Sequence, residues 1–351
     1  MAREYRVGLI GCGRMGATID DEVRDHPHSD LWIPFSHAAG YVAVERTSLV
    51  AVADAIPEKA EAIRQRYGAQ RAYTDYREMI ERERLDIVSV ATRPATHREI
   101  VVYAAEHGVK GIYCEKPLCC SMAEADDIVA ACERHGVKFN YGAQRRYMAL
   151  YHRLRELIAG GEIGEVRGIT AHTAPSSAQW GLTHTSDMLL LLAGDPTIEL
   201  VQSTVDLGGV EFDGNHLATD PRVTSAYVGF SNGIPGYVVT GLGTEFEVIG
   251  TKGAVRTLNN GAQVQLRRAD DRHGVLADVP FPDTPRISGT VKGIEDIVEA
   301  LDTGRETQGH VRLAHRSQEM ILGFVESHRQ DGRRIPLPLA NRELYVGRPD
   351  W

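Results

Sequence analysis

Gly11-Cys12-Gly13-Arg14-Met15-Gly16 follows directly after the apolar run Tyr5 to Ile10, and this order decides the fold. A G-x-G-x-x-G motif between a strand and a helix is the fingerprint of a dinucleotide-binding unit. Gly11 would permit the tight turn, Gly13 would let a pyrophosphate approach the backbone, and Gly16 would let helix and strand pack closely. The start of the helix would attract the phosphate charge. We expect all six residues of the motif to bind the cofactor.

A second cofactor signal is Asp54, which ends the strand-like run Leu49 to Ala53. A carboxylate at this position would accept hydrogen bonds from the adenosine ribose and would repel the extra phosphate of NADP. No arginine follows in Ala55-Ile56-Pro57 to offset that charge. The sequence therefore predicts NAD as the cofactor.

The distance from Gly16 to Asp54 is 54 − 16 = 38 residues, where about 20 is usual. An insertion from Asp20 to Phe35 explains the excess. It could form a loop over the cofactor or substrate, a metal site using His26 and His28, or a solvated acidic loop. Because His-Pro-His lacks the helical spacing that gathers metal ligands, we predict no metal and leave the lid role open.

Up to about Tyr141, short apolar strands alternate with amphipathic helices, which indicates a parallel sheet covered on both faces. Helices are expected from Pro57 to Gly68 and from a capping box at Ser121 to Gly136. The expected strands are Tyr5 to Ile10, Leu49 to Ala53, Ile87 to Ala91, Gly111 to Cys114 and Val137 to Tyr141.

The second part of the chain has a different pattern, a meander of strands that we expect to be antiparallel. It begins after a helix with Leu150, Leu154, Leu157 and Ile158 on one face, and it ends in two helices, near Val291 to Leu301 and Val311 to His328, and an extended tail. The expected strands are Val166 to His172, Glu199 to Val205, Val223 to Phe230, Gly236 to Thr240, Phe246 to Ile249, Ala254 to Leu258 and Gln263 to Leu266. We therefore predict a Rossmann domain over 1–143 and an α+β domain over 144–351.

A lysine stands directly after the expected strand Gly111 to Cys114, in the run Glu115-Lys116-Pro117. Ligands of open parallel sheets bind at the carboxyl ends of the strands, so Lys116 would lie where chemistry takes place. Three residues alone would favour an exposed loop with an ordinary salt bridge. The glycine motif and the strand order favour a functional lysine.

Composition excludes several classes of protein. With 39 basic and 48 acidic residues spread along 351, the net charge of −9 offers no basic stripe for nucleic acid. No apolar run approaches the roughly 18 residues of a membrane span, and the start, Met1 to Val7, has no signal-peptide pattern. Five cysteines, including the pair Cys119-Cys120, fit neither a disulfide framework nor a zinc site. We expect reduced thiols and a cytoplasmic protein.

Over nearly its whole length the chain resembles the glucose-fructose oxidoreductase, inositol dehydrogenase and MocA (Gfo/Idh/MocA) family. The order and spacing of several motifs carry the resemblance. They are the glycine motif, Ala91 to His97, Glu115-Lys116-Pro117, Gln144 to Tyr147, Gly161 to Gly164, His184 to Asp187 and Glu247 to Gly253. The resemblance implies a doubly wound Rossmann sheet, a second α+β domain with a large, mostly antiparallel, open-faced sheet, and a homodimer or homotetramer. It also implies nicotinamide-dependent oxidation or reduction of sugars, cyclitols and related polyols.

The resemblance also implies roles for single residues of the first domain. Lys116 would lie beside the nicotinamide, hydrogen-bond the reacting oxygen and stabilise an alkoxide. Glu115 and Thr92 would contact the cofactor, and Pro117 would fix the turn that aims Lys116. Two further residues, His97 and Arg146, are cofactor candidates near the nicotinamide for which a structural role is an equal alternative.

In the second domain, His184 matches the histidine of the family pattern D-x-G-x-H-x-x-D, which assists proton transfer. The match departs from the pattern because Trp180 replaces the aspartate and Leu182 replaces the glycine. Asp187 remains and would share a helix face with His184, so it could orient the imidazole or act as a structural cap. Trp180 could stack on a sugar ring or belong to the core, and Tyr147 is a second candidate for substrate contact.

The leading hypothesis is therefore an NAD-dependent dehydrogenase of a sugar, cyclitol or glycoside, with Lys116, His184 and Asp187 as catalytic residues. The alternative is an NAD-dependent glycoside hydrolase that works by transient oxidation, elimination and re-reduction. A non-catalytic nucleotide sensor is the third hypothesis, and the presence of both Lys116 and His184 argues against it.

Overall fold

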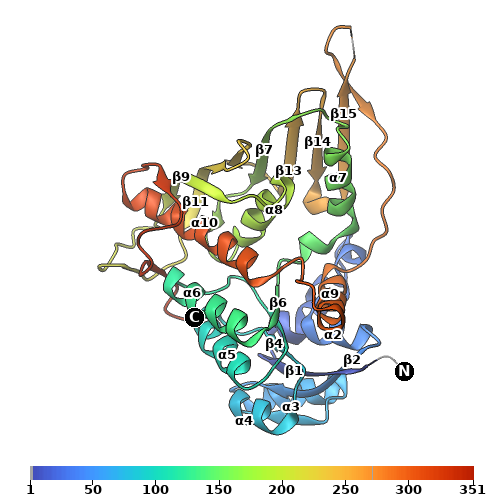
Figure 1. Cartoon of the computed structure of the whole chain (residues 1–351), viewed down its shortest axis with the longest axis vertical. Coiled ribbons are helices and arrows are strands. Elements are labelled where there is room, and N and C mark those ends of the chain that lie inside the picture. The colour runs from blue at the N-terminus through green and yellow to red at the C-terminus, as the bar shows by residue number, and fades with distance from the viewer. Residues whose placement is uncertain (1–2, 271) are drawn as a thin grey trace. The chain divides into compact units, whose positions relative to one another are not determined.

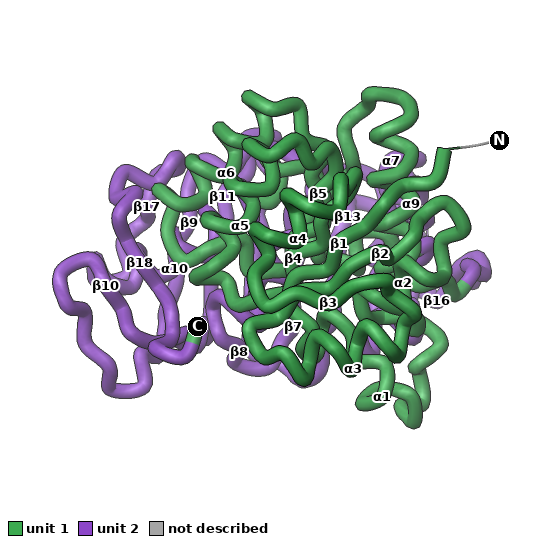
Figure 2. Tube along the Cα trace, turned by 90° about the horizontal axis from the view of Figure 1, so that it is seen from below, with its two compact units in different colours: residues 1–148, 286–315, 351 green, residues 149–285, 316–350 purple. Residues whose placement is uncertain are grey.

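The computed structural model describes residues 3–270 and 272–351 (Figure 1). They form two compact units, coloured separately in Figure 2. Unit 1 contains the described residues up to Met148, together with Arg286–His315 and Trp351. Unit 2 contains Ala149–Pro285 and Arg316–Asp350.

Unit 1 is built on a six-stranded parallel sheet with the strand order β3-β2-β1-β4-β5-β6. This is the doubly wound Rossmann order, which confirms the predicted fold class. The strands are β1 (Tyr5–Ile10), β2 (Thr47–Ala53), β3 (Arg71–Tyr73), β4 (Ile87–Val90), β5 (Gly111–Cys114) and β6 (Lys138–Tyr141). The strand β3 was not predicted, because three residues are too short to show a pattern.

The helices of unit 1 begin and end where capping chemistry predicts. Gly68 ends α3 in the left-handed conformation. Ser121 and Glu124 form the expected capping box of α6, which Gly136 closes. The principal helices are α3 (Pro57–Tyr67), α4 (Tyr76–Glu83), α5 (Pro94–Glu106), α6 (Met122–His135) and α9 (Gly289–Thr303), with the 3-10 turn η3 at Gln144–Tyr147.

The helix expected after the glycine motif is interrupted by the insertion. A π-helical turn, η1 (Arg14–Thr18), leads into the short α1 (Ile19–Val23), and the chain returns through η2 (Ser29–Leu31) to α2 (His37–Ala43). Asp20 closes the insertion, because its two carboxylate oxygens accept the N–H groups of Phe35 (2.8 Å) and Ser36 (2.9 Å). The extra residues thus form a loop between α1 and α2, and the hydrogen bonds of Asp20 hold the two ends of this loop together.

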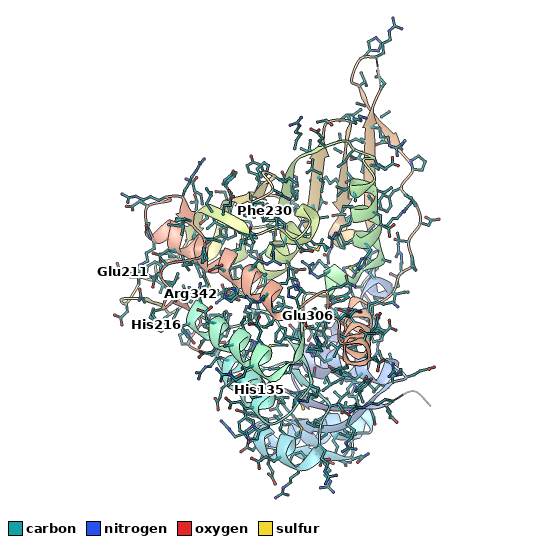
Figure 3. The ribbon with its side chains drawn as sticks, in the orientation of Figure 1. His135, Glu211, His216, Phe230, Glu306 and Arg342 are labelled. Atoms are coloured by element: carbon teal, nitrogen blue, oxygen red, sulfur yellow. The ribbon has the colours of Figure 1, made fainter. Side chains whose placement is uncertain are left out.

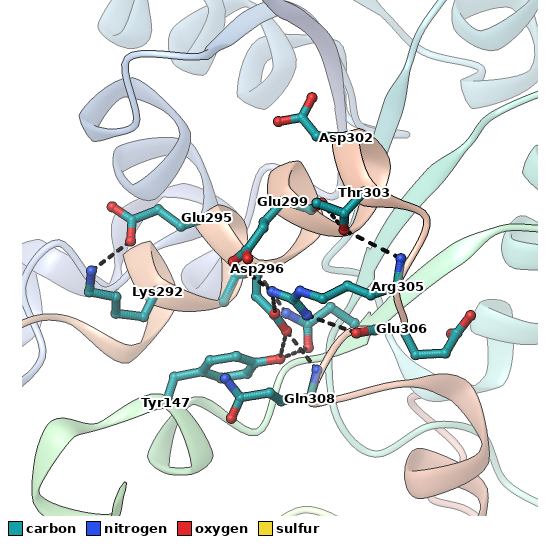
Figure 4. A network of polar contacts seen from close by, with 12 residues as sticks. Tyr147, Lys292, Glu295, Asp296, Glu299, Asp302, Thr303, Arg305, Glu306 and Gln308 are labelled. Carbon is teal, nitrogen blue, oxygen red and sulfur yellow. Dashed lines mark hydrogen bonds and ion pairs between the residues drawn. The ribbon is translucent and has the colours of Figure 1, made fainter.

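The helix α9 belongs to unit 1 although it follows unit 2 in sequence. Ile294, Ile297 and Val298 pack into the hydrophobic core of the Rossmann sheet. On the same helix, Asp296 accepts hydrogen bonds from the Tyr147 hydroxyl (2.7 Å) and the backbone N–H of Gln308 (2.7 Å), as Figure 4 shows. Each compact unit therefore contains more than one segment of the chain, whereas the predicted domains each contain one, with a boundary at residue 143.

Unit 2 is built on a large sheet with the order β16-β15-β14-β13-β7-β12-β11-β9-β17, and β8 pairs with β11. All neighbours are antiparallel except β7 and β12, which run parallel and correct the expectation for that pair. The strands are β7 (Val166–Thr173), β8 (Ser176–Ser177), β9 (Ile198–Asp206), β11 (Arg222–Phe230), β12 (Pro235–Thr240), β13 (Thr244–Gly250), β14 (Gly253–Leu258), β15 (Gln263–Ala269), β16 (Leu276–Val279) and β17 (Ile335–Pro336).

The helices α7 (Ala149–Ala159) and α8 (Thr183–Ala193) and most of α10 (Val311–Arg329) complete unit 2. The tail is extended as expected, and it pairs with the unit through β17 and through β18 (Tyr345–Val346), which lies beside β10 (His216–Leu217). Arg342 of the tail, labelled in Figure 3, lies near α10. Its Nη1 donates to Glu319 of that helix at 2.7 Å. Within 3–270 and 272–351, no helix has both the length and the apolar character of a membrane span.

We predict that Ile297→Ala destabilises unit 1, since Ile297 is fully buried in the sheet core. Truncating such a side chain costs about 2–5 kcal/mol of unfolding free energy. Ile287, which is 40% exposed just before α9, provides the control, and Ile287→Ala should change that free energy by less than about 0.5 kcal/mol. Equal midpoints in urea for the two variants would contradict the placement of α9.

Candidate active site

Backbone hydrogen bonds place three of the predicted segments along one edge of the parallel sheet. Gly11 N–H donates to the carbonyl of Ala53 at 2.8 Å, and Ala91 N–H donates to Ile10 at 2.8 Å. Glu115 N–H donates to Val90, also at 2.8 Å. The glycine turn, the loop after β4 and the lysine after β5 therefore leave the sheet side by side, at the edge where ligands of this fold bind.

The three glycines of the motif differ in the space around them. A Cβ on Gly11, whose φ is +93°, would lie 2.6 Å from the carbonyl oxygen of Ala91, and one on Gly16 would lie 1.9 Å from the carbonyl oxygen of Gly11. A Cβ on Gly13 would meet nothing within 4 Å. Gly11 and Gly16 are thus needed for the turn, while Gly13 leaves open space beside the backbone, which fits a pyrophosphate.

Asp54 is anchored to the glycine turn. Its Oδ2 accepts the N–H of Cys12 (2.9 Å) and its Oδ1 accepts the N–H of Ile56 (3.0 Å). A carboxylate offers about four acceptor positions, so two can still serve ribose hydroxyls.

The other residues of the glycine motif have different surroundings. Burial, together with the Asp54 charge, raises the pKa of the Cys12 thiol to about 12, so the thiol stays neutral. Of the other motif residues, Met15 is half-buried and Arg14 pairs with Glu22 at 2.6 Å.

Glu115 and Lys116 are both largely buried, with 5% and 8% of their surface exposed. The Oε1 atom of Glu115 lies 3.0 Å from His37 Nε2, and its Oε2 accepts the backbone N–H of Lys116 at 3.3 Å. The peptide bond between Lys116 and Pro117 is cis. Burial would raise the pKa of Glu115, but the His37 hydrogen bond and the charges of His37 and Lys116 outweigh it and hold that pKa below its usual value. Glu115 is therefore an ionised carboxylate.

The fully buried ring of His97 contacts backbone on both sides. Its Nδ1 lies 3.0 Å from the carbonyl oxygen of Pro117, and its Nε2 lies 3.2 Å from that of Thr92. Burial lowers the pKa of His97. The ring therefore joins the loop after β4 to the loop after β5, and these contacts favour the structural alternative for His97.

Two other predicted residues of unit 1 are buried in η3. Arg146 has 2% of its surface exposed, and Tyr147 has 4%. The Tyr147 hydroxyl donates to Asp296 and accepts the N–H of Gly309 at 2.9 Å. These contacts tie Tyr147 to α9 and give it a structural role, while its contact with substrate stays a prediction.

In unit 2, His184 and Asp187 lie one turn apart on α8, as expected. The His184 side chain is half-buried, whereas Asp187 is fully buried. Trp180, which precedes the helix, is half-buried and its backbone N–H donates to Asp220 Oδ2 at 2.9 Å. The second oxygen of Asp220 accepts the N–H of Gln179 at 2.7 Å. Asp220 therefore holds the segment that carries Trp180.

Three residues of the site, His37, Ser89 and Asp220, were not predicted from the sequence. His37 and Tyr41 have helical i, i+4 spacing beside small residues, a pattern that could have suggested a buried helix face carrying a histidine. Ser89 is a single polar residue in an apolar strand, and Asp220 is distant in sequence from the residues that it contacts. Neither carries a local signal.

The histidines of the insertion do not gather metal ligands. His26 lies against the Trp32 ring, with 4.7 Å between ring centroids, and 5.8 Å from His28. Among the residues that the structure describes, no three His, Cys, Asp or Glu side chains are grouped to hold a metal ion. His26 thus makes aromatic packing contacts, and its Nδ1 accepts the backbone N–H of His28 at 3.0 Å.

Comparison with known families supplies the name of the fold. A model of the oxidoreductase family's NAD-binding Rossmann fold matches residues 5–143. A model of the family's C-terminal alpha/beta domain matches residues 155–337. The chain belongs to the Gfo/Idh/MocA family of oxidoreductases. Its first domain is therefore the NAD-binding Rossmann domain of that family.

Individual members of the Gfo/Idh/MocA family match the chain in part. D-apiose dehydrogenase of Paraburkholderia graminis is 32% identical over 162 residues, which are 46% of this chain and 38% of that protein. Myo-inositol 2-dehydrogenase of Thermotoga maritima is 28% identical over 160 residues, 46% of this chain and 42% of its own. The chain thus spans about two fifths of the length of these relatives.

Solved structures match the fold over nearly the whole chain. A levoglucosan dehydrogenase in complex with NADH and levoglucosan has a TM-score of 0.75 at 20% identity and covers 96% of this chain and 100% of its own. An aldose-aldose oxidoreductase from Caulobacter crescentus, complexed with glycerol, has a TM-score of 0.75 at 19% identity, with 95% and 100% covered. At these identities the likeness establishes the fold alone.

We predict that Asp220→Ala destabilises unit 2 by about 1–3 kcal/mol, because two partly buried backbone donors lose their acceptor. Urea unfolding monitored by tryptophan fluorescence measures the change near Trp180. Asp278→Ala, on the exposed strand β16, is the control, and it should change stability by less than about 0.5 kcal/mol. A loss no larger for Asp220→Ala than for the control would refute the anchoring role.

Proposed function

We propose that this chain is an NAD-dependent oxidoreductase that transfers hydride between the nicotinamide and a hydroxyl-bearing or keto carbon of a sugar, cyclitol or glycoside. The observation that supports the proposal is the position of the buried residues Glu115 and Lys116. They follow β5 at the sheet edge that also carries the glycine turn, Gly11 to Gly16. A lysine in that place is suited to handle the proton of a reacting hydroxyl. The dehydrogenases of D-apiose and myo-inositol among the relatives support this class of substrate.

The residues present fit NAD. The open space at Gly13 suits the pyrophosphate, and the remaining acceptor positions of Asp54 suit the ribose hydroxyls. The negative charge of Asp54 disfavours an additional phosphate on the ribose. Bound NAD supplies the acceptor for the hydride that leaves the substrate carbon.

Lys116 carries the proton chemistry of unit 1 in this proposal. In the oxidation direction its amine takes the hydroxyl proton as the C–H bond breaks with its electron pair, and the oxygen becomes a carbonyl oxygen. In reduction the ammonium returns the proton to that oxygen. The cation also stabilises alkoxide character on the oxygen, which is worth most in a site that excludes water. Glu115 holds the backbone of Lys116 during both directions through its Oε2 contact.

In unit 2, His184 is the second residue that we propose for proton transfer, and Asp187 is its orienting carboxylate. Their spacing on α8 places both on one helix face. His184 is half-buried, whereas Asp187 lies in the interior. Trp180 offers a flat apolar surface of the kind that stacks on a sugar ring.

We predict that Lys116→Ala lowers kcat by at least about a hundredfold while NAD still binds, because the variant removes the proton acceptor and not the dinucleotide turn. Turnover is followed by NADH absorbance, and binding by titration calorimetry. Lys110→Ala, at an exposed position just before β5, is the matched control and should keep native kcat. Full activity together with lost NAD binding in Lys116→Ala would refute the catalytic assignment.

Asp54→Ala should reduce the preference for NAD over NADP by about tenfold, equivalent to about 1.4 kcal/mol, since a charge that repels the extra phosphate is removed. The measurement is the ratio of kcat/KM for the two cofactors. Glu58→Ala, in the exposed first turn of α3, controls for a general change of surface charge. An unchanged ratio in Asp54→Ala would rule out Asp54 as the discriminating residue.

A further inference from the structure

Three buried side chains form a hydrogen-bonded row that ends at Glu115, the residue before the proposed catalytic lysine. His37, at the first position of α2, is 1% exposed. Its Nε2 lies 3.0 Å from Glu115 Oε1 on one side, and its Nδ1 lies 2.6 Å from Ser89 Oγ on the other. The hydrogen-bonded row of side chains thus consists of Ser89 on β4, His37 on α2 and Glu115 after β5. Glu115 directly precedes Lys116 in the sequence.

Packing holds the members of this row in place. The rings of His37 and Tyr113 are stacked, with centroids 4.5 Å apart and planes inclined by 10°. Gly142 gives the Glu115 carboxylate its room, because a Cβ there would lie 2.8 Å from Oε1. Ser36 caps α2, since its Oγ accepts the N–H of Ala39 at 3.3 Å. His37 is therefore held by a helix cap, a stacked ring and two hydrogen bonds.

The insertion ends directly before this histidine. Asp20 accepts the N–H groups of Phe35 and Ser36, and Thr290 of α9 donates its hydroxyl to the carbonyl of Phe35 at 2.9 Å. These bonds fix the point where the chain enters α2. The closed insertion therefore has a structural consequence at the site, because its neck sets the position of His37.

The chemistry of the three side chains allows a proton to be shared without loss of either hydrogen bond. A serine hydroxyl can donate or accept, so Ser89 can accept from a doubly protonated imidazole or donate to a neutral one. In both states Nε2–H can donate to Glu115. A buried carboxylate is costly unless it is paired and hydrogen-bonded, and His37 provides that partner.

The other titratable groups that act on the carboxylate come from its own strand and from α5. Lys116 follows Glu115, and His97 acts from α5. Tyr113 and Cys114 are neutral, because burial and the Glu115 charge raise the pKa of both. Tyr41 on α2 faces Ser89 and is also neutral, because burial raises its pKa. Of these groups, His37 is the imidazole that lies within hydrogen-bond distance of the carboxylate.

We propose that His37 is a positioning residue of this enzyme, which acts with Ser89 as a proton-sharing relay that keeps Glu115 ionised and in place behind Lys116. The relay rests on the proposed function only for the role of Lys116. Glu115 in turn holds the Lys116 backbone, so the hydrogen bond from a buried histidine contributes to the placement of the lysine. In this proposal the insertion, α2 and β4 contribute to the reaction through the placement of Lys116.

The test compares His37→Gln, whose amide can still donate to Glu115, with His37→Leu, which cannot. Without the imidazole, burial dominates and the pKa of Glu115 rises, so the carboxylate is lost as the pH falls. In His37→Gln we expect the acid limb of the kcat/KM profile to move up by about one pH unit or more. In His37→Leu we expect a larger shift and a kcat/KM lower than that of His37→Gln. Ser89→Ala should shift the limb in the same direction by less.

Infrared difference spectroscopy provides a readout that needs neither turnover nor cofactor. In His37→Gln a protonated carboxyl band should appear at a pH where the native protein has none, and it should vanish when Glu115→Gln is added. His315→Gln is the matched control, because His315 lies 2.9 Å from Asp126 at the surface of unit 1. It should leave both the profile and the spectrum unchanged.

Different results would contradict the role of His37 and the proposed function. A folded His37→Gln and a folded Ser89→Ala with native pH profiles and no new carboxyl band would overturn the relay, as would a uniform loss of activity without any shift. If the native protein oxidised no polyol, that result would contradict the proposed function. The infrared comparison of native protein and His37→Gln would still decide whether His37 controls the protonation of Glu115.

Discussion

The buried carboxylate of Glu115 is the constraint on which this site depends. A carboxylate in the interior is tolerated only with a partner, and here His37 from α2 provides one. That requirement fixes α2 against the sheet, makes Gly142 necessary beside Oε1, and places Lys116 at the strand end. The glycine turn supplies the second part of the edge, because Gly11 and Gly16 leave no room for a side chain. Backbone geometry thus brings the glycine turn and Lys116 to one edge of the sheet, where we propose that the cofactor meets the lysine.

Much of this could be predicted from the sequence because the signals are local. β1 and β5 were placed to the residue, since apolar runs bounded by glycine or polar residues are clear over short windows. The glycine motif, Asp54 and Lys116 were found from their positions after strands. What the sequence did not reveal depends on distant contacts. The joining of α9 to unit 1 and the pairing of His37 with Glu115 connect residues far apart in the chain.

Unit 2 illustrates the same limit with different residues. Its strands follow alternating patterns, yet the parallel pair β7 and β12 was expected to be antiparallel, because pairing direction is set by chain crossings and not by local sequence. The departure of Trp180 from the family pattern was visible at once. Its anchoring by Asp220, 40 residues further on, was not. The family pattern thus located the helix of His184, and the structure explained how the altered segment before it is held.

The central claim is net hydride transfer from a polyol to NAD at the Lys116 site. Its most direct test is the stoichiometry of NADH formed to substrate consumed by the native protein, measured with sugars, cyclitols and aryl glycosides while released sugar is quantified in parallel. The account predicts one NADH for each molecule of at least one such substrate oxidised. Release of free sugar from a glycoside with no accumulation of NADH would contradict it and would instead indicate redox-neutral hydrolysis.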